Sequence, residues 1–373
     1  MEPTLLSRRE ALIGSAATVL VGASGKAGTL QSGLNQDQLK AGIALLKKYP
    51  SVDIHAHPGR FFARGFSGAS RIVKALPAPD EAAAASDLNS GMVSAALFAG
   101  VADMALLDAN AGGGLYAARE FAAGEALADY ERQLTALQHL SADPRLARGK
   151  SVRDIARARR ACRTACVFAV EGGDFIEDRL ERIAAAHAAG VRSITMVHYH
   201  VNAFGDIQTA PAVHGGLTVL GRAAVKAMNK SGVLIDVAHA TFETTRGVVD
   251  ASSRPVMLSH SNLQSATAPN PRLVTPEHAR LVAGTGGLIG SIPWGINQAT
   301  LSDWIDSLLR LVDAVGIDHV GIGTDMDANF RPVFKSYRDW PLIPAMLLAR
   351  GLHEREVAAV IGGNFLRVFA HAT

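Results

Sequence analysis

The chain has 373 residues, of which 48% are hydrophobic and 19% charged, and its formal net charge is only +3. This composition supplies a large buried core, and the lack of a long basic run or of aromatic residues interleaved with Lys and Arg gives no support for nucleic-acid binding. A chain of this length can hold two domains, but α/β barrels commonly fill it as one.

The N-terminal segment has the pattern of an export signal. Arg8 and Arg9 precede an apolar run over 11–23, and small residues follow as far as Ala27, where a signal peptidase could cut. The order S-R-R-x-x-L resembles a bacterial twin-arginine leader, although Ala11 stands where such leaders prefer Phe. We predict that residues 1–27 are a removable signal and that the product is periplasmic or secreted. The alternatives are a membrane anchor or a disordered tail, but the apolar run is too short for a spanning helix.

Beyond residue 36, short apolar runs rich in β-branched residues alternate with helical patterns. The predicted strands cover 52–55, 94–101, 167–170, 192–197, 233–237, 255–258, 287–291 and 319–323. The predicted helices cover 37–48, 114–140, 178–189, 217–231, 241–251, 276–283, 301–315, 342–348 and 354–361. Strands that alternate with helices indicate a parallel sheet. Eight such units predict an α/β fold of the (β/α)₈ TIM-barrel type, in a single domain over 28–373. A doubly wound open sheet is the alternative, because periodicity does not prove closure.

Two cysteines occur, Cys162 and Cys166. Their spacing fits neither a C-x-x-C motif nor a zinc-ribbon pair, and a disulfide in the periplasm stays open. We expect two small buried hydrophobic residues.

Metal-type residues follow the predicted strands. They are His55 and His57 after the first strand, Glu171 after the third, His198 after the fourth, His239 after the fifth, His260 after the sixth and Asp325 after the eighth. The i, i+2 spacing of His55 and His57 places both on one face. The carboxyl ends of all strands open onto one face of a barrel, so these side chains should converge.

Each of these residues alone is weak evidence, since an H-x-H pair arises often by chance and a lone histidine or acid has structural uses. Their joint occurrence at six of eight strand ends is what predicts a metal site. Imidazoles and carboxylates together suit zinc or a similar divalent cation.

The sequence resembles the membrane (renal-type) dipeptidase family of zinc peptidases, within the amidohydrolase barrel superfamily, from about residue 52 to residue 369. The motifs that carry the resemblance are, in chain order, V-D-I-H-A-H, F-A-V-E-G-G, V-H-Y-H-V-N-A-F-G-D, G-V-L-I-D-V-A-H, R-P-V-M-L-S-H-S-N, P-R-L-V-T-P-E, H-V-G-I-G-T-D-M-D and G-G-N-F-L-R-V-F. Several motifs in the correct order make this resemblance specific.

The resemblance implies two divalent metal ions, zinc in the family, bridged by a glutamate and a hydroxide that attacks the amide bond of a dipeptide. The implied metal ligands are His55, His57, Glu171, His239 and His260. Three other positions have implied roles in catalysis or substrate binding. His198 polarises the substrate carbonyl, Arg272 holds the substrate carboxylate, and Asp325 carries the proton to the leaving amine. One position departs from the pattern, because the family usually has H-x-D where this chain has His57.

The expected partner is therefore a small dipeptide substrate, without nucleic acid or a stable membrane span, and a homodimer stays open. Another hydrolase of the superfamily, such as a lactonase or phosphotriesterase, would also use the histidines. Such enzymes often bridge their metals through a modified lysine on the fourth strand, and residues 192–200 contain no lysine. A binding protein without catalysis is the second alternative, against which His198 and Asp325 argue.

Overall fold

The computed structural model describes residues 33–68, 70–110, 113–265, 269–296, 298–329 and 331–373. The predicted export signal lies outside these residues. Within the described ranges, no helix combines the length and the apolar character that crossing a membrane requires.

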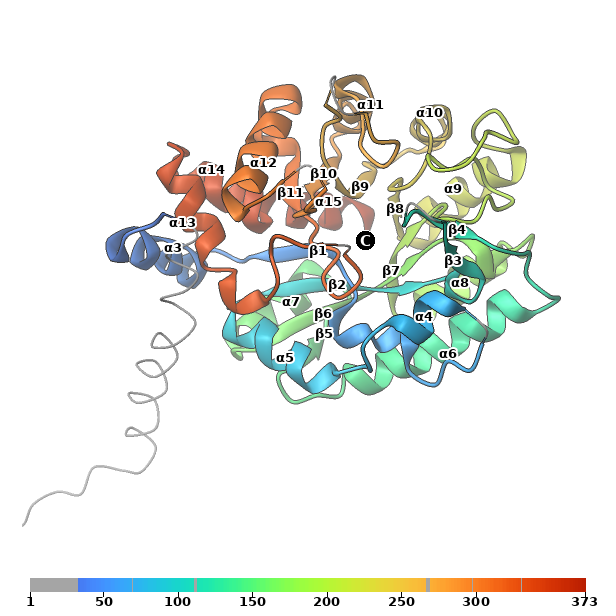
Figure 1. Ribbon diagram of the computed structural model, residues 1–373, viewed down its shortest axis with the longest axis horizontal. Coiled ribbons are helices and arrows are strands. Elements are labelled where there is room, and N and C mark those ends of the chain that lie inside the picture. The colour runs from blue at the N-terminus through green and yellow to red at the C-terminus, as the bar shows by residue number, and fades with distance from the viewer. Residues whose placement is uncertain (1–32, 69, 111–112, 266–268, 297, 330) are drawn as a thin grey trace, which may run out of the picture.

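Eight parallel strands surround the centre of the molecule, with helices outside them (Figure 1). In spatial order the strands are β1 (Val52–Ala56), β2 (Ala95–Val101), β6 (Thr164–Glu171), β7 (Val191–Thr195), β8 (Leu234–Asp236), β9 (Met257–Ser261), β10 (Leu288–Ser291) and β11 (Val320–Ile322). Every residue of these eight strands is buried, because both faces of the sheet are covered. The short strand β5 (Leu146–Arg148) also pairs with β6.

The helices follow the strands along the chain. They are α3 (Gln36–Lys48), α4 (Arg71–Ala75), α5 (Glu81–Ser90), α6 (Glu125–Leu140), α7 (Val152–Arg160), α8 (Glu181–Ala189), α9 (Val219–Ser231), α10 (Phe242–Ala251), α11 (Pro276–Ala283), α12 (Leu301–Val315), α13 (Leu342–Ala349), α14 (Glu354–Ala358) and α15 (Asn364–Ala372). Each of α9 to α12 begins after a threonine whose hydroxyl accepts a backbone N–H of the first turn. These caps define where each loop above the barrel ends.

The first and last strands meet at their carboxyl ends. His57 N donates to Met326 O and Asp325 N donates to His55 O, both at 2.9 Å. The buried Asp53 carboxylate accepts hydrogen bonds from Thr324 N and Oγ1. The barrel is thus nearly closed. The predicted TIM-type fold is confirmed, and the open-sheet alternative is wrong.

One predicted helix is wrong over part of its length. Residues 114–140 were expected to be helical, but β4 (Leu115–Ala117) pairs antiparallel with β3 (Leu107–Ala109), and α6 begins only after Gly124. Gly124 has a φ of 76°, a backbone conformation that glycine adopts without strain and that separates the hairpin from the helix. Helices α4, α5, α7 and α15 were not predicted.

Candidate metal centre

The carboxylate of Glu171, at the end of β6, lies at the centre of a ring of histidines. The Nε2 atoms of five histidines lie within 3.5 Å of its oxygens, at 3.3 Å for His55, 3.5 Å for His57, 3.5 Å for His198, 3.0 Å for His239 and 3.5 Å for His260. All six side chains are buried. The predicted convergence of strand ends therefore occurs in the structure.

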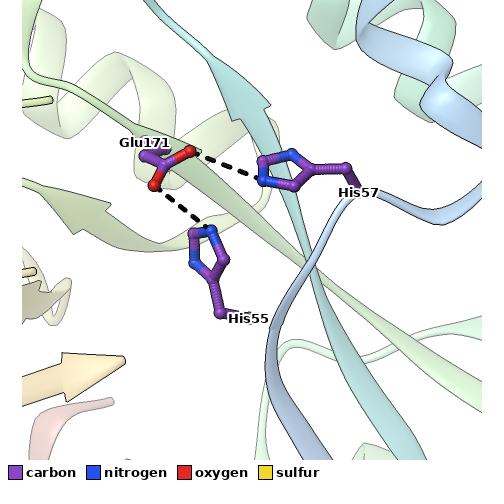
Figure 2. Close-up of side chains that lie close together, drawn as sticks. All are labelled: His55, His57 and Glu171. Carbon is purple, nitrogen blue, oxygen red and sulfur yellow. Dashed lines mark ion pairs between the residues drawn. The ribbon is translucent and has the colours of Figure 1, made fainter. Parts of the chain in front are cut away.

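The ligand-type atoms form two groups that share Glu171. The first triad is His55, His57 and Glu171, and Figure 2 shows both imidazoles directed at the two carboxylate oxygens. The second triad is Glu171, His239 and His260. Within each triad the ligand atoms lie within 4.8 Å of one another, so each group has the donor types and the spacing to hold a divalent cation.

The state of the ring nitrogens in the first triad also fits a cation. The Nε2 atoms of His55 and His57 are buried and make no hydrogen bond within the described part of the chain. His57 Nδ1 lies 2.7 Å from the carbonyl oxygen of Ala99. A carbonyl only accepts, so Nδ1 carries the proton and the Nε2 lone pair of a neutral ring faces Glu171.

The charges at the centre favour ligand binding. Burial alone would raise the pKa of Glu171, but His198 and His55 hold it well below its usual range. Burial and the charge of Arg272 hold the pKa of His239 well below its usual range, and burial and His55 do the same for the pKa of His260. The second triad thus presents an ionised carboxylate and neutral imidazoles, the forms that bind metals.

His55 differs from these two histidines. Burial alone would lower its pKa, but the Glu171 carboxylate raises it to about 9. A cation bound at Nε2 must displace that proton, so cation binding to the first triad should release a proton near neutral pH.

Backbone strain occurs at the same strand ends. His239 and Asp325 have φ values of 67° and 55°, which are uncommon outside glycine. Each of these left-handed residues lies three positions after the end of its strand, β8 or β11, where its side chain joins the cluster. Asp325 Oδ1 lies 3.1 Å from His57 Nε2, and its side chain is 20% exposed. Asp325 therefore stands where the buried cluster meets solvent.

His198 is oriented by a residue that the sequence analysis missed. Asp103, fully buried after β2, lies 2.6 Å from His198 Nδ1 through Oδ1, and its Oδ2 accepts the backbone N–H groups of Tyr199 and His200. Burial would lower the pKa of His198, but Asp103 and Glu171 raise it. The ring is thereby held with Nε2 toward Glu171.

Arg272, in the loop after β9, reaches the second triad. One guanidinium nitrogen donates to Gln208 Oε1 at 2.7 Å, and the other lies 3.0 Å from His239 Nε2 and 3.2 Å from His260 Nε2. A cation and the guanidinium cannot share these nitrogens, because both are positive and both require the same lone pairs. The side-chain oxygen of Gln208 is a hydrogen-bond acceptor for the guanidinium that is separate from these two histidine nitrogens.

A second buried pair lies beside the centre. His200 Nδ1 is 2.6 Å from Asp174 Oδ1, and His200 Nε2 is 2.9 Å from Glu120. The H-x-H spacing of His198 and His200 was the available signal, but the second histidine faces away from Glu171. Elsewhere, Cys166 is buried as expected, whereas Cys162 is exposed and both thiols are free.

A parallel eight-stranded barrel with histidines and a shared carboxylate at its strand ends defines the amidohydrolase-like class of barrels. A family model described as Membrane dipeptidase (Peptidase family M19) matches residues 40–373. The chain belongs to this family, which confirms the predicted resemblance.

Curated relatives agree with this assignment. The chain is 31% identical over 225 residues to Dipeptidase tcpJ of Claviceps purpurea, covering 58% of this chain and 52% of that protein. It is 29% identical over 217 residues to Dipeptidase 3 of Mus musculus, covering 55% of this chain and 44% of that protein. The chain spans about half the length of these curated relatives.

Solved structures share the fold. The probable dipeptidase PvdM from Pseudomonas aeruginosa aligns with a TM-score of 0.75 at 20% identity, over 91% of this chain and 99% of that one. A metallopeptidase from Rhodobacter sphaeroides, liganded with a phosphinate mimic of the dipeptide L-Ala-D-Ala, aligns with a TM-score of 0.72 at 19% identity, over 87% of this chain and 99% of that one. These likenesses support the barrel architecture.

Proposed function

We propose that this protein is a metal-dependent dipeptidase that hydrolyses the amide bond of dipeptides with two divalent cations, both zinc. One observation carries the proposal. A single buried carboxylate, Glu171, is faced by the Nε2 atoms of five histidines within 3.5 Å, in a chain of the membrane dipeptidase family. A ligand set of nitrogens with one shared carboxylate favours zinc over harder cations.

In this proposal the first triad would hold one cation and the second triad the other. Cations at these positions supply Lewis acidity for a carbonyl and lower the pKa of a bound water. The protein supplies the remaining groups. His198 donates from Nε2 to the carbonyl oxygen as negative charge grows there. Asp325 accepts the proton of the attacking water and gives it to the leaving amine, and Arg272 pairs with the terminal carboxylate of the substrate.

The test is metal analysis of the purified protein together with a substrate panel. The panel holds L-Ala-L-Ala, L-Ala-D-Ala, their C-terminal amides and a simple lactone. We expect two equivalents of zinc and hydrolysis of at least one free dipeptide. Lactone hydrolysis without dipeptide hydrolysis would assign the protein to another reaction of the superfamily, and bound zinc without any hydrolysis would make it a binding protein.

We further propose export through the twin-arginine-type signal over residues 1–27, supported by the S-R-R-x-x-L order. Replacing Arg8 and Arg9 together by lysine should retain the protein in the cytoplasm. Cell fractionation measures this, and an unchanged distribution would contradict the proposal.

A further inference from the structure

Ser259, on β9, contacts one histidine of each triad. Its Oγ atom lies 2.9 Å from His260 Nδ1 and 3.3 Å from His55 Nδ1. The residue is fully buried. A single hydroxyl thus lies behind a ligand of the first triad and a ligand of the second, on the side away from Glu171.

The hydrogen-bonding capacity of this hydroxyl decides which atoms carry protons. Ser259 Oγ donates to Asp236 Oδ2 at 2.6 Å, and a hydroxyl has one proton and two lone pairs. Its donor is therefore used, and both lone pairs remain for the two ring nitrogens. The Nδ1 atoms of His55 and His260 must then be the donors, so Nε2 is the atom of each ring that remains to bind a cation.

Asp236 holds the hydroxyl in this orientation. Its carboxylate is buried and also accepts hydrogen bonds from Thr195 Oγ1 at 2.7 Å, Ser259 N at 2.9 Å and Ala238 N at 3.0 Å. A carboxylate with four donors around it is fixed in place, so the Ser259 proton has one favourable direction. The other two ligand histidines lack this support, because His57 is held by a carbonyl and His239 Nδ1 has no hydrogen-bond partner within the described residues.

We propose that Ser259, oriented by Asp236, is a positioning residue that couples the two cation sites by fixing a histidine ligand of each. The inference rests on the proposed metal-dependent function. Partners of the non-ligating histidine nitrogen commonly change metal affinity by 10–100-fold. Since one hydroxyl serves both triads, its removal should weaken both sites together.

The experiment compares wild type with Ser259→Ala by competitive titration of zinc against a chromophoric chelator. We expect both dissociation constants to rise by roughly 10–100-fold in the variant. The matched control is Thr195→Val, which removes another hydrogen bond to the same oxygen of Asp236 but contacts neither His55 nor His260. In the control both affinities should stay near the wild-type values.

A measurement on wild type alone keeps the inference testable if Ser259→Ala does not fold. In ¹⁵N-edited NMR of the zinc-loaded protein, the rings of His55 and His260 should both show a protonated, slowly exchanging Nδ1. Loss of one site only in Ser259→Ala, an equal effect of Thr195→Val, or an unprotonated Nδ1 on either ring would overturn the coupling role. A wild-type protein that takes up no zinc would instead overturn the proposed function itself.

Discussion

The Arg272 guanidinium approaches the same two nitrogens that the second cation requires. If it turns toward a substrate carboxylate when the cation is bound, Arg272→Ala should raise KM for a free dipeptide by roughly one to two orders of magnitude, since losing a charge-assisted hydrogen bond costs ~1.5–3 kcal/mol. The C-terminal amide of the same dipeptide should lose much less. Steady-state kinetics on the pair measures this.

The control for this prediction is Arg280→Ala on α11, which removes an exposed arginine bonded to the Ala314 carbonyl oxygen. Equal losses for acid and amide would show that Arg272 does not read the carboxylate.

Asp103 offers a second test at single-residue scale. In Asp103→Asn the amide oxygen can still accept the backbone N–H groups, but its NH₂ would donate to His198 Nδ1. The ring would then be neutral, and its Nε2–H would be a weaker donor to the substrate carbonyl. We expect kcat to fall by roughly 10²–10⁴-fold, with zinc content unchanged. Asp174→Asn makes the same change in the neighbouring pair, whose histidine faces away from Glu171, and should keep kcat. A similar kcat in both variants would contradict the role of Asp103.

His278 on α11 predicts a pH dependence of stability. Its Nε2 bonds Thr245 Oγ1 at 2.8 Å, and burial lowers its pKa to about 4 from an unfolded value of 6.5. As the pH falls, the unfolded chain therefore binds a proton at His278 before the folded chain does. The free energy of unfolding should drop by about 3 kcal/mol as the pH falls from 6.5 to 4.

Chemical denaturation of the metal-free protein measures this effect against His278→Gln, because contributions of all other groups cancel in the difference. The free energy of unfolding of wild type should fall relative to the variant over that pH range. A constant difference would show that the ring is not held neutral.

At the scale of secondary-structure elements, β10 packs tightly beside the strand that carries Ser259. A Cβ atom on Gly290 would lie 1.8 Å from the Ser259 carbonyl oxygen. Gly290→Ala must therefore push β9 away, and we expect a loss of ~1–3 kcal/mol or more in unfolding free energy together with weaker zinc binding.

Thr300→Ala is the comparison for that variant. It removes the capping box of α12, which is expected to cost ~1 kcal/mol, and should leave zinc affinity unchanged. Thermal unfolding and zinc titration give both quantities, and wild-type behaviour of Gly290→Ala would contradict the packing argument.

The elements that could be predicted from the sequence are those with a regular pattern. The i, i+2 spacing at the end of β1 and the regular alternation of strands with helices were enough to predict the barrel and the convergence of His55, Glu171 and His239. The pairing of β3 with β4 could not be predicted, because each strand has only three residues, too few for an alternating pattern to be recognised. Asp103 could not be predicted either, because its partner is 95 residues away and the contact exists only in the folded barrel.

At the scale of the whole molecule, the proposed cations would join the ends of β1, β6, β8 and β9. Removing them with a chelator should therefore lower the unfolding temperature, since a ligand at 100 times its dissociation constant contributes ~2.7 kcal/mol per site. Scanning calorimetry with and without zinc measures this shift. Glu171→Gln, which alters the carboxylate shared by both triads, should show a much smaller difference. An unfolding temperature independent of zinc in wild type would contradict the linkage.

The seam between β1 and β11 also has a consequence for the nascent chain. Asp53 and Thr324 are 271 residues apart and meet only when the last strand of the barrel, β11, is in place. A ribosome that has made four-fifths of the protein has made neither Thr324 nor Asp325, so the barrel closes around the complete centre only at the end of synthesis. Under the proposed twin-arginine route, which carries folded cargo, the centre would be filled before translocation. The metal supply of the compartment in which the protein is made, rather than that of the compartment to which it is exported, would then decide which ion the protein carries.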